Sequence, residues 1–315
     1  MQSVEETIIS QIKRASRAVA GRHVRVGIGD DTAVLRLPKA AGELLLTTDQ
    51  IIENTHFKRN KHPARALGHK TLARGLSDIA AMGGAPLGFL LSLCLPEWAR
   101  DPWLKHYVGG MFQLSKKHNV PCLGGDVARG DRFSADITVV GSVPRGTALT
   151  RGKARPGDLV FVSGSLGGSA LGLGNLLTTG ALRGAARRHL YPEPRLALGA
   201  FLRGKLKATA AMDLSDGLSM DLARLARASK VGAEISAAAI PVFRGASLEH
   251  ALHGGEEYEL LFTVRATSRV PPSFEGVRLT CIGRIRKQRG VVLRTERGVE
   301  SLKPVGFQHF GSEGQ

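Results

Sequence analysis

Seven aspartates in this chain stand next to apolar, alanine-rich or glycine-rich segments. Six of them follow segments that are typical of strands, and Asp78 lies in a helical segment of apolar and small residues. Carboxylates gathered in one cleft repel each other and raise their own pKa values unless cations lie among them. The seven are Asp30, Asp31, Asp49, Asp78, Asp126, Asp213 and Asp216.

Magnesium is the cation that such a group of carboxylates favours. Mg²⁺ prefers hard oxygen ligands, keeps several waters, and is usually held by a few carboxylates together with substrate phosphates. The hydroxyls of Thr47 and Thr48, next to Asp49, add two more oxygen ligands. A single such aspartate is more often a helix N-cap or part of an Asx-turn. Because five segments share this pattern, we expect several Mg²⁺ ions held against a polyphosphate.

The familiar nucleotide-binding and hydrolytic motifs are absent from the sequence. It has no Walker A segment, no protein-kinase HRD or DFG set, no GxSxG elbow and no HExxH pair. A glycine-rich turn at residues 164–169, between a predicted strand and a helix, could present backbone N–H groups to a phosphate. A nucleotide would therefore be bound in another way, and a hydrolase or a zinc enzyme is disfavoured.

Strands and helices alternate in the predicted secondary structure, which favours an α/β (α+β) fold in two lobes. A segment rich in Gly, Arg and Pro at residues 144–157 precedes a new strand, so we expect domains at residues 1–146 and 147–315. Helices are expected at residues 4–20, 63–82, 102–118, 164–177 and 219–229. Strands are expected at residues 24–28, 33–37, 44–48, 88–95, 121–123, 135–143, 159–163, 260–264 and 279–282.

The composition describes a folded and strongly basic chain. Its 315 residues carry 44 Lys+Arg against 27 Asp+Glu, a formal charge of +17, and 43% are hydrophobic. Such a charge suggests nucleic acid, an anionic membrane surface or a small anionic substrate. The basic residues are scattered, no RRM, KH or helix-turn-helix signature accompanies them, and aromatics are 5% of the chain. We therefore expect no specific nucleic-acid partner.

The cysteines and the apolar segments indicate in which cellular compartment the protein is expected. Cys94, Cys122 and Cys281 are far apart and form no CxxC pair, which suits neither a disulfide framework nor a zinc site. Glycines and prolines interrupt the longest uncharged run, residues 79–96, and the first residues lack the pattern of a signal peptide. We expect a cytoplasmic protein without a membrane partner.

Seven segments, taken together and in order, resemble the thiamine-monophosphate kinase family. They are GIGDD at residues 27–31, TTD at 47–49, NTHF at 54–57, LSDIAAMG at 76–83, GGD at 124–126, DLSDG at 213–217 and GGEEYEL at 254–260. The broader superfamily includes aminoimidazole ribonucleotide synthetase, selenophosphate synthetase and a hydrogenase maturation factor. Selenophosphate synthetase would need a reactive Cys or selenocysteine near the amino terminus, and no cysteine precedes Cys94. Aminoimidazole ribonucleotide synthetase fits the NTHF and GGEE segments poorly.

The resemblance implies an activity, an architecture and a set of site residues. The activity is ATP-dependent phosphorylation of thiamine monophosphate to thiamine diphosphate, the last step of thiamine diphosphate biosynthesis. The architecture is the two-domain aminoimidazole ribonucleotide synthetase-like fold, with mixed sheets covered by helices. Its amino-terminal domain binds Mg-ATP and pairs in a homodimer. The family's metal positions match Asp31, Thr47, Thr48, Asp49, Asp78, Asp126, Asp213 and Asp216, its nucleotide contacts match Gly125, Asp126, Arg151 and Ser215, and its substrate pocket matches His56, Glu256 and Phe307.

These residue types suit phosphoryl transfer to a phosphate. The attacking phosphate is already anionic, so positioning and charge neutralisation matter more than a general base. Arg151 can clamp a phosphate bidentately. Glu256 could accept a hydrogen bond from a pyrimidine or balance a thiazolium, and Phe307 could stack on a ring. We expect direct in-line transfer, with a phospho-aspartate intermediate as the alternative.

Overall fold

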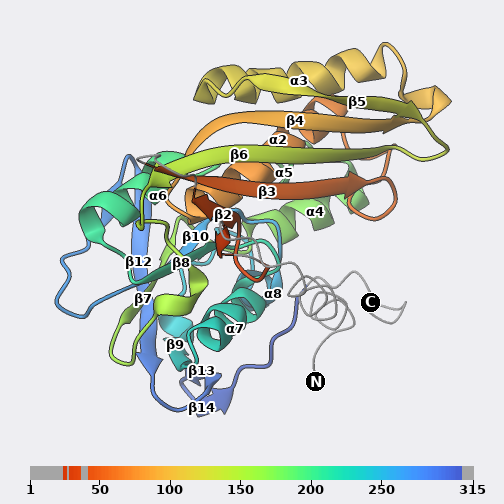
Figure 1. Cartoon of the computed structure of the whole chain (residues 1–315). Coiled ribbons are helices and arrows are strands. Elements are labelled where there is room, and N and C mark those ends of the chain that lie inside the picture. Colours follow the sequence, from red (N-terminus) through yellow and green to blue (C-terminus); the bar gives the residue numbers. More distant parts are fainter. Residues whose placement is uncertain (1–23, 27, 37–41, 307–315) are drawn as a thin grey trace.

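The computed structural model describes residues 24–26, 28–36 and 42–306, arranged in two lobes of strands and helices (Figure 1). The helix expected at residues 4–20 and the predicted substrate contact Phe307 lie outside these ranges. The two lobes confirm the predicted α/β (α+β) fold, whereas pairing of amino-terminal domains stays a prediction. In the described ranges, no helix is long and apolar enough to cross a membrane.

The amino-terminal lobe is a six-stranded sheet with helices on one face. The strand order is β1-β2-β3-β6-β4-β5, and all neighbours are antiparallel except β4 and β5. Alternate residues of β6, such as Ile137 and Val139, are buried against the helices, as expected for a sheet covered on one side. The strands are β1 Val24–Val26, β2 Ala33–Arg36, β3 Gly42–Ile52, β4 Ala85–Leu95, β5 Cys122–Arg129 and β6 Ser134–Pro144.

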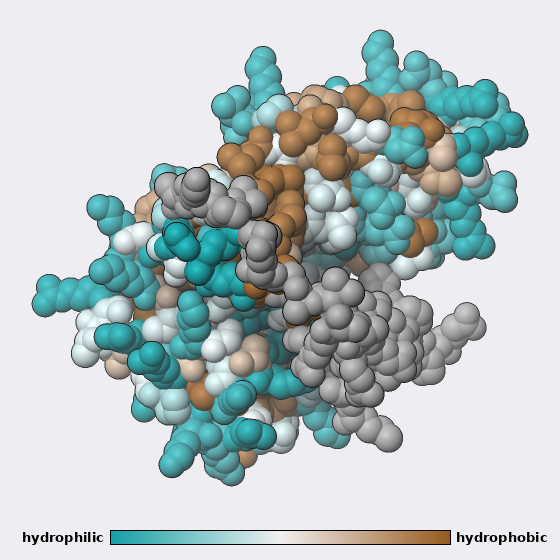
Figure 2. All heavy atoms as spheres, in the orientation of Figure 1, coloured by the Kyte–Doolittle hydropathy of each residue, from teal (hydrophilic) through white to brown (hydrophobic). Residues whose placement is uncertain are grey.

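Among the described residues, no helix covers the opposite face of this sheet. Figure 2 shows an apolar band on it, over β3, β6 and β4. The register places Leu46 opposite Val140, and Leu90 opposite Thr138, on this same face. Leu90 is 41% exposed. An uncovered apolar sheet face of this kind is typical of a protein interface.

Helix α2, Ala64–Ala81, lies between the first sheet, helix α3, Trp103–His118, and the second lobe. Two glycines allow α2 and α3 to cross closely. A Cβ at Gly68 would lie 1.8 Å from the backbone oxygen of Tyr107, and one at Gly110 would lie 1.8 Å from that of Arg65. The helix is buried on most sides, so its polar side chains are held in fixed positions between the lobes.

The carboxyl-terminal lobe is built on an eight-stranded, mostly antiparallel sheet with the order β14-β13-β9-β12-β7-β10-β8, and β11 pairs with β12. The strands are β7 Leu159–Ser163, β8 Ala210–Asp213, β9 Gly232–Ser236, β10 Leu260–Val264, β11 Ser273–Phe274, β12 Val277–Arg286, β13 Gly290–Thr295 and β14 Gly298–Ser301. The helices are α4 Gly168–Thr179, α5 Ala185–Leu190, α6 Leu196–Phe201, α7 Leu218–Ala228 and α8 Leu248–His253. Each lobe has its own apolar core.

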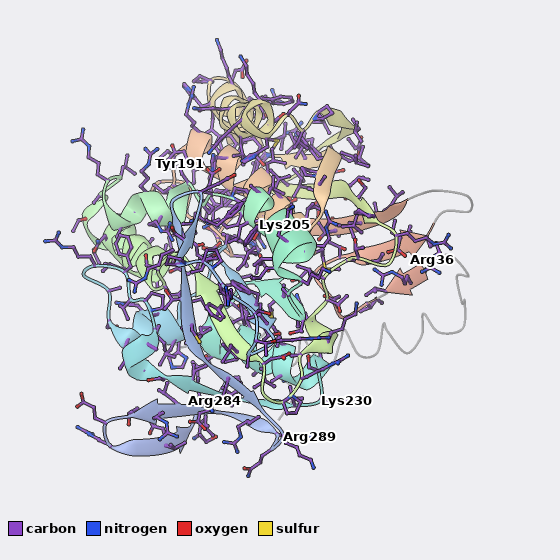
Figure 3. All side chains as sticks on the ribbon, turned by 90° about the vertical axis from the view of Figure 1, so that its left-hand side faces the viewer. Arg36, Tyr191, Lys205, Lys230, Arg284 and Arg289 are labelled. Carbon is purple, nitrogen blue, oxygen red and sulfur yellow. The ribbon has the colours of Figure 1, made fainter. Side chains whose placement is uncertain are left out.

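Basic side chains are spread over the surface (Figure 3). Arg36 projects from β2, whereas Lys230, Arg284 and Arg289 project at the far end of the carboxyl-terminal lobe. They form no single stripe in this view, which agrees with the scattered pattern in the sequence.

The predicted elements within the described ranges are present, β3 and β12 are longer than predicted, and β9, β13 and β14 were not predicted. The difference that affects a predicted site segment is at β5. A strand was expected only at residues 121–123, with GGD following it, but β5 runs over Cys122–Arg129. The glycines explain the difference. Gly125 has a φ of +157°, and a Cβ there would lie 1.8 Å from the backbone oxygen of Leu91 on β4. The glycine pair therefore continues the strand close against its neighbour instead of ending it.

Candidate functional site

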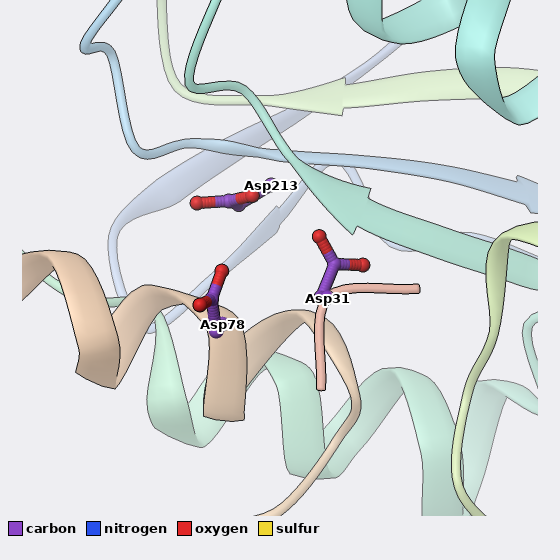
Figure 4. Close-up of side chains that lie close together, drawn as sticks. All are labelled: Asp31, Asp78 and Asp213. Atoms are coloured by element: carbon purple, nitrogen blue, oxygen red, sulfur yellow. The ribbon is translucent and has the colours of Figure 1, made fainter. Parts of the chain in front are cut away.

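Three carboxylates from distant parts of the sequence meet between the lobes (Figure 4). Asp31 precedes β2, Asp78 lies in the last turn of α2, and Asp213 ends β8. One oxygen of each lies within 4.8 Å of the others. Asp31 and Asp213 are 7% and 3% exposed. The structure thus brings together three of the predicted metal ligands.

Neighbouring side chains fix these three carboxylates. Arg151 Nη2 donates to Asp31 Oδ1 at 2.5 Å, and its Nε donates to Oδ2 at 3.3 Å. Ser77 Oγ donates to Asp213 Oδ2 at 2.7 Å, and Thr47 Oγ1 donates to Asp78 Oδ2. The carboxylates are therefore oriented in advance of any ligand.

The electrostatics of this cluster fit a bound cation. Burial raises the pKa of Asp78, and the charges of Asp49, Asp213 and Asp31 raise it further. Burial and the charge of Asp31 likewise raise the pKa of Asp213, although the bond from Ser77 opposes this. A cation among the carboxylates removes the repulsion that disfavours their ionised form. Hard carboxylate oxygens at this spacing suit Mg²⁺.

Strand β3 places its three predicted ligands on two different faces. Thr47 and Asp49 face α2, where Arg74 Nη2 donates to Asp49 Oδ1 at 3.1 Å. Thr48 points to the uncovered face, where it accepts a hydrogen bond from Thr138 Oγ1 at 3.2 Å. Thr47 and Asp49 are therefore near Asp78, and Thr48 is not.

Asp126 lies far from the three carboxylates within this chain. The register aligns Asp126 on β5 with Ser92 on β4, Asp136 on β6 and Gln50 on β3. Gln50 Nε2 donates to Asp136 Oδ2 at 3.4 Å, so this row shares the uncovered face. At a strand spacing of about 4.8 Å, β5 is about 14 Å from β3. Asp126 and the adjacent Gly125 are not brought to the cluster.

The loop after β8 supplies two further predicted residues. Asp221 Oδ2 accepts hydrogen bonds from the backbone N–H groups of Ser215 and Asp216, both at 3.0 Å. Arg224 Nη1 donates to the Asp216 carboxylate and, at 3.1 Å, to Asp221. This loop is therefore held at the start of α7, with Ser215 and Asp216 facing the cavity beside the cluster.

A cavity of about 370 Å³ connects the carboxylates to the second predicted group of residues. Glu256 faces it, and Lys70 Nζ donates to Glu256 Oε2 at 2.7 Å. Burial would raise the pKa of Glu256, but the charges of Lys70 and Arg74 and the nearby His189 hold it at about 2. The lining residues are Asp49, Thr55, His56, Arg74, Asp78, Arg151, Ser169, Ala170, Leu173, His189, Asp213, Ser215, Asp216, Gly255, Glu256 and Tyr258.

Lys70, Arg74 and His189 are the charged or ionisable residues around the cavity whose contacts matter most here and that were not predicted from the sequence. Lys70 and Arg74 precede Asp78 by eight and four residues, so the three lie on one face of α2. That spacing was a usable signal. His189 lies on the short helix α5, within a basic stretch of the sequence, and no local signal marks it.

Two family models match the chain, one in each lobe. The AIR synthase related protein, N-terminal domain, matches residues 29–143, and the AIR synthase related protein, C-terminal domain, matches residues 155–296. The fold, with its carboxylates between the lobes, is therefore that of an AIR synthase related protein.

Individual relatives of the chain identify a narrower family within the AIR synthase related proteins. Thiamine-monophosphate kinase of Escherichia coli (strain K12) is 38% identical over 308 residues, covering 92% of this chain and 93% of the relative. That of Bacillus subtilis (strain 168) is 34% identical over 314 residues, covering 93% and 96%. A solved structure, AaThiL complexed with AMPPCP and TMP, is 31% identical, covers 98% of this chain and 99% of its own, and has a TM-score of 0.84. The chain belongs to the thiamine-monophosphate kinase family.

Proposed function

We propose that this chain transfers the γ-phosphoryl group of ATP to thiamine monophosphate, giving thiamine diphosphate. The observation that carries the proposal is a single cavity that joins the acidic residues Asp78 and Asp213 to an ionised carboxylate, Glu256. The first group suits metal-bound phosphates and the second suits a cationic heterocycle. Family membership and the AMPPCP and TMP bound to AaThiL support the same reaction.

Asp31, Asp78 and Asp213 would hold Mg²⁺, with Thr47, Asp49 and Asp216 as further oxygen ligands close by. When bound, Mg²⁺ neutralises the phosphates and lowers the repulsion between the two anionic substrates. The chain's own residues position these groups. Arg151 holds Asp31, and Ser77 holds Asp213.

Direct in-line transfer fits these residues better than a covalent intermediate. The attacking oxygen belongs to a phosphate, which needs no proton removed by a strong base. The buried carboxylates are already engaged by Arg151, Ser77 and Thr47, so none is a free nucleophile. The site residues therefore bind and orient the two substrates.

We propose that the chain acts as a homodimer through the uncovered sheet face. The apolar side chains of Leu46, Leu90 and Val140 on that face support this. Thr48 and Asp126 stay proposed ligands that would act in the dimer, because they share this face, and Gly125, next to Asp126 on β5, stays a proposed nucleotide contact.

The predicted domains, 1–146 and 147–315, stay a proposal, and the interval between the matched family models, residues 144–154, supports it. Phe307 stays a proposed ring contact. The free cysteines Cys94, Cys122 and Cys281 support the predicted cytoplasmic location, since they suit a reducing compartment.

A coupled ADP-release assay with Mg-ATP and a panel of acceptors tests the function. We expect thiamine monophosphate to stimulate ADP release, and EDTA to abolish it. Release with selenide or an aminoimidazole precursor, but not with thiamine monophosphate, would overturn the proposal.

A further inference from the structure

Helix α2 connects the two ends of the cavity. Asp78 belongs to the carboxylate cluster, Arg74 pairs with Asp49, and Lys70 pairs with Glu256. At a rise of 1.5 Å per residue, Lys70 and Asp78 are about 12 Å apart along the helix axis. The helix therefore sets the distance between the metal end of the site and the Glu256 end.

Lys70 is buried behind the Glu256 carboxylate. Its side chain is 2% exposed, whereas that of Glu256 is 26% exposed and lines the cavity. Burial lowers the pKa of Lys70, and its contact with Glu256 opposes that shift. Lys70 belongs to the amino-terminal lobe and Glu256 to the carboxyl-terminal lobe, so the pair also joins the lobes. A ligand in the cavity meets the carboxylate and not the ammonium.

His189 strengthens the same arrangement. Burial and the charge of Lys70 lower the pKa of His189 to about 3, so its imidazole is neutral. Lys70 Nζ lies 3.2 Å from Nε2, which therefore accepts, and Nδ1 carries the proton. Nδ1 lies 3.1 Å from Ser169 Oγ and 3.4 Å from Glu256 Oε2. Lys70 and His189 thus approach the same oxygen of Glu256, and Oε1 is the one available to a ligand.

The backbone at Glu256 is also constrained. Its φ is +60°, which is uncommon for a residue with a side chain. The Glu256 N–H donates to the Ser215 oxygen at 2.7 Å, and the Tyr258 N–H donates to the Leu214 oxygen at 2.9 Å. Such strain persists where the surroundings fix a residue in position, and it is typical of functional sites.

We propose that Lys70 is a positioning residue that, with His189, orients Glu256 so that its free oxygen faces a cationic or N–H-donating ring of the substrate. Lys70 acts only through Glu256 and contacts no substrate itself. The inference rests on the proposed function, because it assigns the heterocyclic half of thiamine monophosphate to this end of the cavity.

The test compares Lys70→Met, Glu256→Gln and the double variant. Losing the oriented charge should raise KM for thiamine monophosphate roughly 10- to 100-fold in each single variant. KM for ATP and kcat should stay within about twofold, because the metal end is about 12 Å away. The double variant should have the same KM as Glu256→Gln, since Lys70 has nothing left to orient. Lys117→Met, which removes the lysine of an exposed pair with Glu193, is the matched control and should leave all constants unchanged.

A further rise of KM in the double variant, or an equal loss of kcat and ATP affinity in Lys70→Met, would show a purely structural role and overturn the proposal. The Lys70→Met protein could fail to fold, because it leaves the Glu256 carboxylate buried without its partner. The double variant has no such unpaired carboxylate, so comparing its KM with that of Glu256→Gln still tests the proposal.

Calorimetric binding of thiamine without ATP separates the two proposals. A wild-type protein that binds thiamine but does not phosphorylate its monophosphate would overturn the function alone. Equal weakening in all three variants would then support the role of Lys70. No thiamine binding by the wild type would count against both.

Discussion

Replacing Asp213 by Asn should stabilise the metal-free protein while abolishing its activity. The asparagine side chain would keep an oxygen that can accept the hydrogen bond from Ser77, but it would carry no charge. Asp31, Asp78 and Asp213 have oxygens within 4.8 Å of one another, so the change removes two repulsive pairs. It also removes a proposed metal ligand.

The size of the effect follows from these distances. Two full charges 4.8 Å apart repel by about 3 kcal/mol at an effective dielectric constant of 20. Partial protonation and the nearby Arg151 reduce this, so we expect a gain in unfolding free energy of roughly 1–3 kcal/mol, or about 2–5 °C in Tm.

The gain should depend on pH. Burial and Asp31 raise the pKa of Asp213 in the folded protein above its unfolded value of about 3.9. Between these two values the folded protein binds more protons than the unfolded chain, so its unfolding free energy falls as pH rises. The Asp213→Asn variant has no carboxyl group at this position, so its unfolding free energy does not fall with pH for this reason. Its advantage should be small near pH 4 and largest above the folded pKa.

Thermal melts of the wild type and of Asp213→Asn at several pH values, in EDTA and in Mg²⁺, measure this difference in stability. Saturating Mg²⁺ should stabilise the wild type by about 2.7 kcal/mol at one hundred times its Kd, and the variant much less. Asp131→Asn, at an exposed aspartate in the turn before β6, is the control and should behave as wild type. A variant that is less stable than wild type in EDTA at alkaline pH, or that gains as much from Mg²⁺, would refute the reasoning.

Three further changes have separate consequences. Arg151→Met leaves the buried Asp31 carboxylate without its guanidinium, and urea unfolding should show a loss of roughly 3–5 kcal/mol. Gly68→Ala pushes a methyl group against the Tyr107 carbonyl, so the protein should lose roughly 1–3 kcal/mol or more, seen as a lower Tm. Leu90→Glu places a charge on the uncovered sheet face, and sedimentation should then show monomers where the wild type forms dimers. A Leu90→Glu protein that sediments as wild type would place the dimer contact elsewhere.

The elements with a clear local pattern were predictable, and those that depend on neighbours were not. The buried strands β7 and β10 have the bounds that the sequence predicts, because a short apolar run marks a buried strand. For β5 the predicted strand is too short, because a glycine pair usually indicates a turn. Only the close approach of β4 shows why glycine stands inside that strand.

Some features of the candidate site were likewise predictable from the sequence, and others were not. Residue type and apolar context selected Asp31, Asp78 and Asp213, and the fold brings them together. The strand period of two already separates Thr48 from its neighbours Thr47 and Asp49, so that distinction was available from the sequence. The position of Asp126 was not, because it depends on the order of strands in the sheet.

A few of the chain's many basic residues have a specific role at this site. Most basic side chains lie scattered on the surface, but Lys70, Arg74 and Arg151 are each paired with a carboxylate of the cavity or of the cluster beside it. Lys70 and Arg74 favour the ionised form of Glu256. Arg151 favours the ionised form of Asp213, whereas burial disfavours that form. Both ends of the cavity therefore depend on buried cations, and one helix, α2, supplies two of them. A change in the orientation of α2 would move the proposed metal end and the proposed substrate end together.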